Sequence, residues 1–460
     1  KAEDVVIAGT DTAVLLYGCS RVYLHALTIQ ATCALFGIYI GGNCNDIRIS
    51  HCRINANRIS TTTYGIYLSS GYKRDRIQIV GNHIDGGSYG ISFYSGTAAN
   101  AAAHGRYHLI DSNRIENFLY TGIYAYYSDF ESISHNRISA SDLAGPYSNG
   151  YGLNTYYCNH KYIVGNCIDL LREYFYVVYG MYVNYSNYDS YAQHITDTTY
   201  VLDNDIQTYG SNGFTNSLYL NYGNLQVIHN SLYMKSKYEN GYGICLVETS
   251  PYVCEVKNNS VYVDGGCSVY PICCSGPNEL FRISGNNVFH TCATSSLPDL
   301  AVFNNKECYT LAELQGYDAE ATVIRPAYFN GNVRDRIYFN DSMTAVPVTN
   351  QYYQTYGYVD KSGTLRKGTR VTRGAYEAQP MNSNAQLLTF VSPAADGIPN
   401  GTTVEIKVVM RNDADSVLTS CNVEWEVNGI RQAPYVWKGK LSKGTADTLC
   451  LGKVNVSDRV

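Results

Sequence analysis

The sequence lacks long hydrophobic runs, an excess of basic residues and closely spaced metal-binding cysteines. No apolar run reaches the roughly 18 residues of a membrane span, so we expect no transmembrane segment. The net charge of −5 argues against a nucleic-acid partner, because phosphate binding needs a basic stripe. The chain opens at Lys1 without a signal-like segment, so we expect a mature or trimmed chain.

Charged residues are scarce, whereas tyrosine is abundant. Only 16% of the chain is charged, below the usual quarter, and polarity comes from Asn, Ser, Thr and 45 Tyr. This mixture is typical of extracellular β proteins and sugar-binding surfaces. With 460 residues, 45% of them hydrophobic, the chain is long enough for two or three domains, or for one solenoid with an appendage.

The 15 cysteines are an odd number without metal-ligand spacing. Cys245 in "GICLVE" and Cys167 in "NCIDL" stand where strands usually carry aliphatic residues. We therefore expect most cysteines to be buried free thiols. A disulfide between Cys421 and Cys450 is an alternative that the sequence leaves open.

One phrase, Ile-x-x-Asn-x-Ile, recurs through the first two thirds of the chain. Its mean spacing is about 29 residues, within the range of solenoid repeats. Each unit alternates with period two and is rich in β-branched residues, which excludes helical repeats. The copies are ISHCRI (Cys52), IVGNHI (Asn82), IDSNRI (Asn113), ISHNRI (Asn136), IVGNCI (Asn166), VLDNDI (Asn204), VIHNSL (Asn230), VKNNSV (Asn259) and ISGNNV (Asn286).

A unit of three short strands without a helix has to stack on its neighbours, as a right-handed parallel β-helix does. The recurring Asn tolerates left-handed backbone geometry and can hydrogen-bond the Asn of the next coil, forming a ladder along a tight turn. The pattern resembles the pectate-lyase-like superfamily over residues 4–305. The resemblance implies a ladder between the second and third strands, and sugar binding along the first.

The Gly-Ile segments, such as "GIYL" and "GIYA", are then the first strands. Alternation turns Ile38, Ile66, Ile91, Ile123, Leu153 and Met181 inward. The outward residues form a strip of phenols and amides suited to an extended polysaccharide. The alternative is that stacked tyrosines only stabilise the strands. Our candidate substrate-binding residues are Tyr67, Tyr94, Tyr124, Tyr126, Asn154, Tyr156 and Tyr182.

Catalysis would need ionisable groups, and the outward first-strand positions carry none. Hydrolysis needs a pair of carboxyl groups, whereas a lyase needs a base and a cation. The polygalacturonase and pectate-lyase signatures are absent, so loops would have to supply these groups. Glu173, Asp189 and His194 are the catalytic candidates, because they lie in two insertions that flank one strand. The charges of "GYKRDR", including Arg74, are expected to be solvated, and contact with an acidic sugar is the alternative.

The chain beyond Asn286 changes character. Residues 306–380 contain Gly-Tyr-Asp-Ala at 316–319 and Gly-Ala-Tyr-Glu at 374–377, which resemble the closing segment of secreted bacterial β-helix proteins. Such a segment would cap the exposed strand edges. Residues 381–460 alternate with turn signals and resemble CARDB-type Ig-like domains of Bacteroidetes, which act as spacers or attachment units.

The expected fold is therefore all-β, with a right-handed parallel β-helix of about ten coils (1–305), a closing segment (306–380) and an Ig-like β-sandwich (381–460). We expect a secreted or bacterial cell-surface protein that binds polysaccharide and is a glycoside hydrolase or polysaccharide lyase. The alternative is a non-catalytic glycan-binding or adhesion protein. No cofactor is expected, except Ca²⁺ for a lyase.

Overall fold

The structure is a computed structural model of the chain, and it divides into two compact units, Lys1–Ala378 and Gln379–Val460. Each unit is described by itself. The described residues are 5–58, 62–97, 103–140, 148–171, 175–189, 194–195, 197–210, 213–237, 241–247, 252–266, 269–292, 299–324, 327–328, 337–338, 345–366, 371–377, 385–393, 401–414, 416–427 and 430–455.

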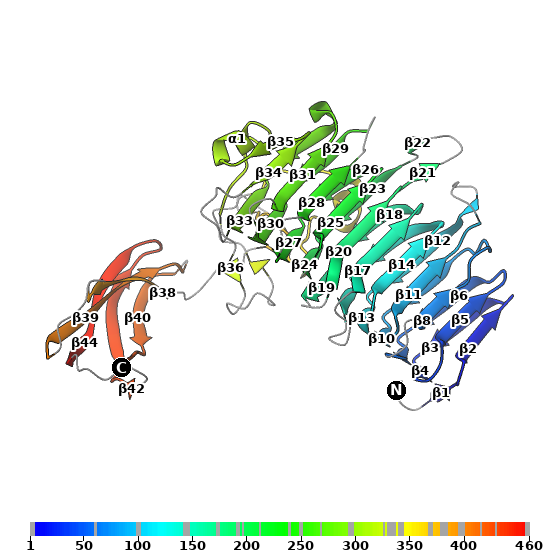
Figure 1. The fold of residues 1–460 in the computed structure, drawn as a ribbon, viewed down its shortest axis with the longest axis horizontal. Coiled ribbons are helices and arrows are strands. Elements are labelled where there is room, and N and C mark those ends of the chain that lie inside the picture. The colour runs from blue at the N-terminus through cyan, green and yellow to red at the C-terminus, as the bar shows by residue number, and fades with distance from the viewer. Residues whose placement is uncertain are drawn as a thin grey trace. The chain divides into compact units, whose positions relative to one another are not determined.

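The first unit is a parallel β-helix, as predicted, in which three sheets run along one axis (Figure 1). Among the described residues the sheets hold 12, 10 and 11 strands, and the last strand of the 12-stranded sheet is antiparallel. The first-strand sheet comprises β2 (Thr12–Tyr17), β5 (Phe36–Gly41), β8 (Tyr64–Leu68), β11 (Tyr89–Tyr94), β14 (Thr121–Tyr126), β17 (Ser148–Tyr156), β20 (Phe175–Asn184), β25 (Thr215–Asn221), β28 (Gly241–Val247), β31 (Val269–Ser275), β34 (Ala301–Phe303) and β35 (Lys306–Cys308). The second-strand sheet comprises β3 (Ser20–His25), β6 (Asn45–Ser50), β9 (Ile77–Val80), β12 (Gly105–Asp111), β15 (Ser128–Ser134), β18 (Asn159–Val164), β23 (Thr198–Leu202), β26 (Asn224–Ile228), β29 (Cys254–Lys257) and β32 (Phe281–Ser284). The third-strand sheet comprises β1 (Val6–Ala8), β4 (Thr28–Ala31), β7 (Arg53–Ala56), β10 (His83–Asp85), β13 (Arg114–Phe118), β16 (Arg137–Ala140), β19 (Cys167–Leu171), β24 (Asp205–Gly210), β27 (Ser231–Ser236), β30 (Ser260–Gly265) and β33 (Asn287–Cys292).

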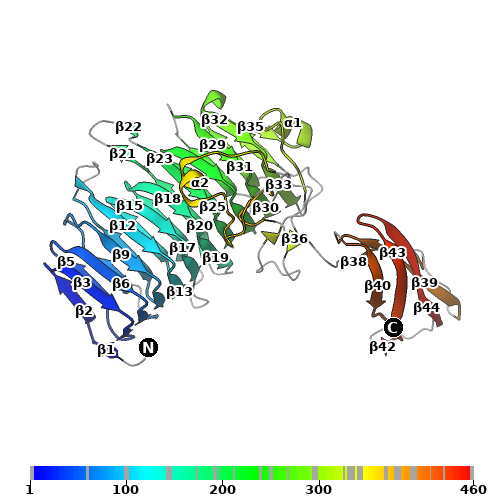
Figure 2. The same ribbon diagram turned by 180° about the vertical axis from the view of Figure 1, so that it is seen from behind.

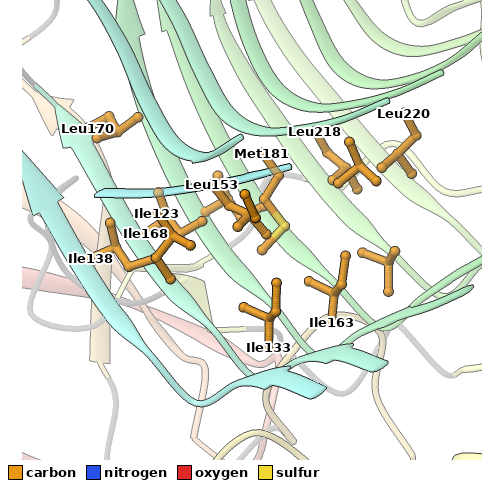
Figure 3. Packing of buried hydrophobic residues seen from close by; sticks show 14 of the residues in the cluster. Ile123, Ile133, Ile138, Leu153, Ile163, Ile168, Leu170, Met181, Leu218 and Leu220 are labelled. Atoms are coloured by element: carbon orange, nitrogen blue, oxygen red, sulfur yellow. The ribbon is translucent and has the colours of Figure 1, made fainter. Parts of the chain in front are cut away.

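The core consists of stacked, mostly aliphatic side chains that all three sheets contribute. Figure 3 shows Ile123, Ile133 and Ile138 of one coil beside their counterparts in the next. All three are essentially inaccessible to solvent. Because equivalent residues pair in register, each Ile packs on the corresponding residue of its neighbouring coils, and every coil depends on the next.

The predicted asparagine ladder is present in the turn between the second and third strands. The Nδ2 group of each Asn donates to the Oδ1 atom of the next, as between Asn82 and Asn113 at 3.0 Å. The same Nδ2 group donates to a backbone carbonyl, and Oδ1 also accepts the backbone N–H of the preceding ladder residue. The ladder links Asn82, Asn113, Asn136, Asn166, Asn204, Asn230, Asn259 and Asn286.

One part of our explanation for the ladder was wrong. The left-handed backbone conformation belongs to the residue before each ladder position, such as Ser112 (φ 56°) before Asn113 and His135 (φ 53°) before Asn136. Gly fills this position in several coils, as at Gly81 and Gly165. The Asn is therefore used for its two-sided amide, not for its tolerance of positive φ.

Asp318 ends the ladder. Its carboxylate accepts the backbone N–H groups of Gly285 and Asn286 at 2.7 and 2.9 Å, and the Nδ2 group of Asn286 at 2.9 Å. A carboxylate suits this end, because every group that it faces is a donor. The Gly-Tyr-Asp-Ala phrase, with α1 (Leu311–Gln315) before it, thus completes the last coil.

Residues 345–366 and 371–377 run back along the ladder edge instead of remaining at the end of the solenoid. Their helix α2 (Gln351–Tyr356) lies over the second-strand sheet (Figure 2), where Tyr353 donates to Asp203 at 2.7 Å. Arg366 is fully buried between Asp203 and Glu377, at 2.7 and 2.6 Å. Of the described helices, including η2 (Asn278–Leu280), none is long and apolar enough to cross a membrane.

The second unit consists of small antiparallel sheets, as predicted, around a core that includes Val408, Trp437 and Leu449. Its similarity to CARDB domains remains a prediction. The strands are β38 (Ala385–Ser392), β39 (Thr403–Asn412), β40 (Leu418–Val423), β41 (Glu426–Val427), β42 (Ile430–Arg431), β43 (Tyr435–Leu441) and β44 (Ala446–Asn455). Within this unit, β41 and β42 form a short antiparallel pair.

The first unit also contains two short antiparallel strand pairs outside its three sheets. They are β21 (Tyr188–Asp189) with β22 (His194–Ile195), and β36 (Ala327–Tyr328) with β37 (Ile337–Tyr338).

The cysteines whose side chains the structure describes are free thiols, and most of them are buried, as predicted. Cys245 lies in β28 with 1% of its surface exposed. Cys421 and Cys450 are both free, so the alternative of a disulfide between them is not realised.

The termination of the ladder by Asp318 can be tested by substitution. Asp318→Ala would leave three buried donors without their acceptor, so we expect the β-helix to lose about 3 kcal/mol of unfolding free energy. Denaturant titration followed by circular dichroism measures this loss. Glu320→Ala, which removes an exposed carboxylate two residues away, should change stability by less than about 0.5 kcal/mol. Equal stability of the two variants would contradict this role for Asp318.

Candidate functional site

The outward residues of the first strands form two columns of aromatic rings along the solenoid. One column stands before the glycine of each Gly-Ile strand, and the other three residues later. Many rings stack on their neighbours: Tyr64 and Tyr89 lie 5.2 Å apart at 12°, and Tyr151 and Tyr179 lie 5.3 Å apart at 3°. Rings that stack in this way cover each other's faces and turn their edges and hydroxyl groups to solvent.

Several residues without aromatic rings interrupt these columns, and three small polar ones lie close together. Ser92 stands between Tyr67 and Tyr124, and Asn154 follows Tyr124 on the next coil. Thr121 takes the place of a ring in the other column. Where the rings are missing, the surface sinks into a hollow of about 560 Å³. The hollow is lined by Tyr64, Tyr67, Tyr89, Ser92, Tyr94, Tyr120, Thr121, Tyr124, Asn149, Tyr151 and Asn154.

The hollow has a polar floor and no charged lining. Ser92 and Thr121 are only 2% and 3% exposed and lie at its base. The Oδ1 atom of Asn154 is buried and has no hydrogen-bond partner among the described residues. Hydroxyl and amide groups both donate and accept hydrogen bonds, so this lining suits a ligand that is itself rich in hydroxyl groups.

Five phenols of the hollow stay protonated at neutral pH. Burial raises the pKa of Tyr64, Tyr67, Tyr89 and Tyr151 above the ordinary tyrosine value. The pKa of Tyr94 is raised by burial and also by a hydrogen bond to Tyr124. These rings therefore serve as neutral hydrogen-bonding groups and are poor bases at neutral pH.

Arg74 lies beside this surface. The expectation that its charge is solvated was wrong. Its side chain is fully buried. All five guanidinium hydrogens can be assigned, since Nε donates to Gly42 O and the two Nη groups donate to Ser69, Tyr94 and Ile40 at 2.8 to 3.3 Å. Burial lowers the pKa of Arg74 from its ordinary value. This arginine fixes the loop before β9 and has no donor left for an acidic sugar.

The candidate substrate-binding residues fall into two groups. Tyr67, Tyr94, Tyr124 and Asn154 line the hollow. Tyr126, Tyr156 and Tyr182 lie outside it and continue the aromatic surface, with ring distances of 5.7 Å from Tyr94 to Tyr126, 5.8 Å from Tyr126 to Tyr156 and 5.9 Å from Tyr156 to Tyr182.

Sequence reasoning missed the column of rings that precedes the glycines. Strict alternation turns Tyr64 inward if Tyr67 points outward, yet both line the hollow. Gly65 accounts for the difference, because a Cβ atom there would lie 2.5 Å from Ile84 and 2.6 Å from the carbonyl oxygen of Gly90. Two successive residues, Gly65 and Ile66, therefore face the core. The repeated Tyr-Gly-Ile phrase was the signal that could have located this column.

The catalytic candidates lie in poorly described parts of the chain. Glu173 lies outside the described residues. Asp189 in β21 and His194 in β22 are opposite each other in a short antiparallel hairpin after β20, but their side chains lie outside the described part. The structure thus pairs these two backbone positions and leaves their chemistry a prediction.

On the neighbouring sheet, the carboxyl group of Asp129 has a perturbed environment. Burial raises the pKa of this carboxyl to about 6, against the lowering effect of a hydrogen bond to Asn159. Asp129 lies in β15 and does not line the hollow. No group of three or more His, Cys, Asp or Glu side chains in the described ranges is arranged to hold a metal ion.

The protonation of these phenols predicts how ligand binding depends on pH. A raised pKa means that the neutral ring is retained as the pH rises towards 10, so these phenols do not titrate between pH 6 and 9. We expect the affinity for a neutral glycan to vary less than twofold over this range, as measured by calorimetry. A tenfold loss within it would mean that a titrating group controls binding.

Comparisons with known proteins support the fold of the N-terminal part. The family model described as "Right handed beta helix region" matches residues 3–104. No curated protein matches the chain. A solved structure of a double mutant of the tailspike protein of E. coli bacteriophage HK620, in complex with a pentasaccharide, has 10% sequence identity and a TM-score of 0.20. The alignment covers 97% of this chain and 74% of that one. At this TM-score, the match supports no conclusion about the fold or function of this chain.

Proposed function

We propose that this protein binds an extended, neutral polysaccharide along its first-strand sheet, with one sugar unit seated in the hollow. The observation that carries the proposal is the hollow itself, where Ser92, Thr121 and Asn154 stand at positions that tyrosine rings fill on both adjacent coils. A surface that served only to stabilise the strands would gain from continuous stacking at these positions.

The chemistry of the lining favours a neutral glycan over an acidic one. The described lining carries phenol, hydroxyl and amide groups and no cation that could neutralise a uronate. The nearby guanidinium of Arg74 is already fully hydrogen-bonded to protein groups. An anionic sugar would lose hydration in the hollow without gaining a counter-charge. A location outside the cell or on its surface follows from this proposal, since extended polysaccharides are encountered there.

Cleavage of the bound polysaccharide is the second candidate function. It is supported by the hairpin of β21 and β22, which leaves the same sheet after β20 and sets Asp189 opposite His194. Hydrolysis would require one of the loop carboxyl groups, such as Glu173 or Asp189, to reach the bound sugar as a proton donor.

Filling the hollow tests the binding function. Asn154→Tyr would restore a ring between Tyr124 and Tyr182, which already occupy equivalent positions on the two adjacent coils. For each polysaccharide that the wild-type protein binds, we expect this variant to bind at least tenfold more weakly. Its melting temperature should be unchanged. Affinity electrophoresis against neutral β-glucan, galactomannan and arabinoxylan, with polygalacturonate as the acidic comparison, measures the effect.

Tyr219→Asn is the matched control for this substitution. It makes the reverse change in the same column, one coil beyond Tyr182, and should leave affinity within twofold. Retained binding by Asn154→Tyr, or a preference of the wild-type protein for polygalacturonate, would refute the proposal.

Product analysis separates binding from cleavage. Mass spectrometry after prolonged incubation with the same polysaccharides would reveal hydrated oligosaccharides from a hydrolase and unsaturated ones from a lyase. If Asp189 takes part, Asp189→Asn should abolish the products and leave retention in affinity electrophoresis intact. Retention without any product would favour a binding protein.

A further inference from the structure

A row of four tyrosines occupies the corner where the first strands turn into the second strands. Tyr127, Tyr157, Tyr185 and Tyr222 take this position on four successive coils, and all have positive φ, between 49° and 55°. We call these four residues the corner row. Gly18 and Gly42 occupy the same turn in earlier coils, also with positive φ.

Tyrosine is an unfavourable residue for this backbone conformation. The left-handed region brings the Cβ atom of an L-residue close to its own carbonyl oxygen, a contact that glycine avoids. The early coils show that glycine satisfies the turn in this fold. Four successive tyrosines therefore imply that the phenol rings are needed at this corner.

The rings of the corner row stack along the solenoid axis. Their centroids are 6.0 Å apart from Tyr127 to Tyr157, 4.4 Å from Tyr157 to Tyr185, and 4.6 Å from Tyr185 to Tyr222. All four side chains are half-buried. The stacking covers the ring faces, so each coil offers ring edges and a hydroxyl group at the surface.

The corner row is continuous with the hollow through single rings. The ring of Tyr126 lies 6.4 Å from that of Tyr124, which lines the hollow, and 4.2 Å from that of Tyr127. Within one coil, Asn154 and Tyr157 are three residues apart, a separation of about 10 Å along an extended strand. The hollow and the corner row thus share the coils of β14 and β17 and are joined by an aromatic surface.

We propose that the corner row is a second sugar-binding track, which holds the side branches of a neutral, branched polysaccharide whose backbone occupies the hollow. The inference rests on the proposed function. A linear chain that runs along the axis would follow only one of the two tracks. A linear chain that runs parallel to the strands would meet the corner on only one coil, whereas the row repeats on four coils.

The test compares branched with unbranched probes of the same backbone. Xyloglucan is paired with cellohexaose, and galactomannan with mannohexaose, because each pair shares its backbone and differs in branches. For at least one pair, the wild-type protein should bind the branched probe at least tenfold more tightly. Tyr157→Phe/Tyr185→Phe should reduce that ratio at least fivefold, since the hydroxyl groups contact the branches, and should leave the affinity for the linear probe unchanged.

A second variant separates recognition from stability. Tyr157→Gly/Tyr185→Gly places at this turn the residue that Gly18 and Gly42 already supply, so it should fold with an unchanged or higher denaturation midpoint. It should lose the preference for branches as the Phe variant does. A lower midpoint together with an undiminished preference would assign the row a purely structural role and overturn the inference.

The proposals for the hollow and for the corner row can be refuted separately. If Asn154→Tyr abolishes binding of both probes while the corner variants keep the wild-type preference, only the branch track is refuted. If wild-type protein binds the linear probe as tightly as the branched one, the branch track is refuted as well. If Asn154→Tyr leaves binding of both probes intact, the proposed function is refuted, and the inference that rests on it falls with it.

Discussion

Register is the constraint on which the rest of this β-helix depends. The Asn ladder hydrogen-bonds each coil to the next at one corner, and the stacked Ile side chains fix the same alignment from inside. Because the coils cannot slip past one another, any residue type that recurs in the repeat becomes a column on the surface. The tyrosine columns are thus a consequence of the same alignment that buries Ile123 and Leu153.

Buried charged residues hold the returning segment and the end of the ladder in place, whereas the proposed binding surface is neutral. Arg366 bridges Asp203 and Glu377 beneath the returning segment, and Asp318 accepts the last donors of the ladder. Arg74 likewise donates its hydrogen bonds to protein groups, mainly backbone carbonyls. These buried charges keep their hydrogen-bond partners within the protein, since an unpaired buried charge would be far more costly than a paired one.

The sequence predicted what repeats and missed what departs from the repeat. The ladder from Asn82 to Asn286 and the inward Ile residues follow from periodicity alone. Tyr64 was missed because alternation fails at Gly65, where the crowding that excludes a side chain is set by the next coil. The hollow was missed for a related reason: Ser92, Thr121 and Asn154 lie on different strands, and only the register brings their gaps together. Arg74 was misjudged because its partners, Gly42 and Tyr94, come from two other coils.

In a solenoid, a hollow can arise where a large side chain is missing from a column, and a new surface where one is added. On most folds a pocket needs loops of particular shape, whereas here the loss of a ring from a column leaves space with tyrosine walls already in place. The corner shows the opposite operation, in which Tyr157 occupies a backbone position that Gly42 fills without strain. The two departures share the coils of β14 and β17, and neither disturbs the inward residues that hold those coils in register. The repeat therefore supplies stability uniformly, and the exceptions to it form the two surfaces that we propose for recognition.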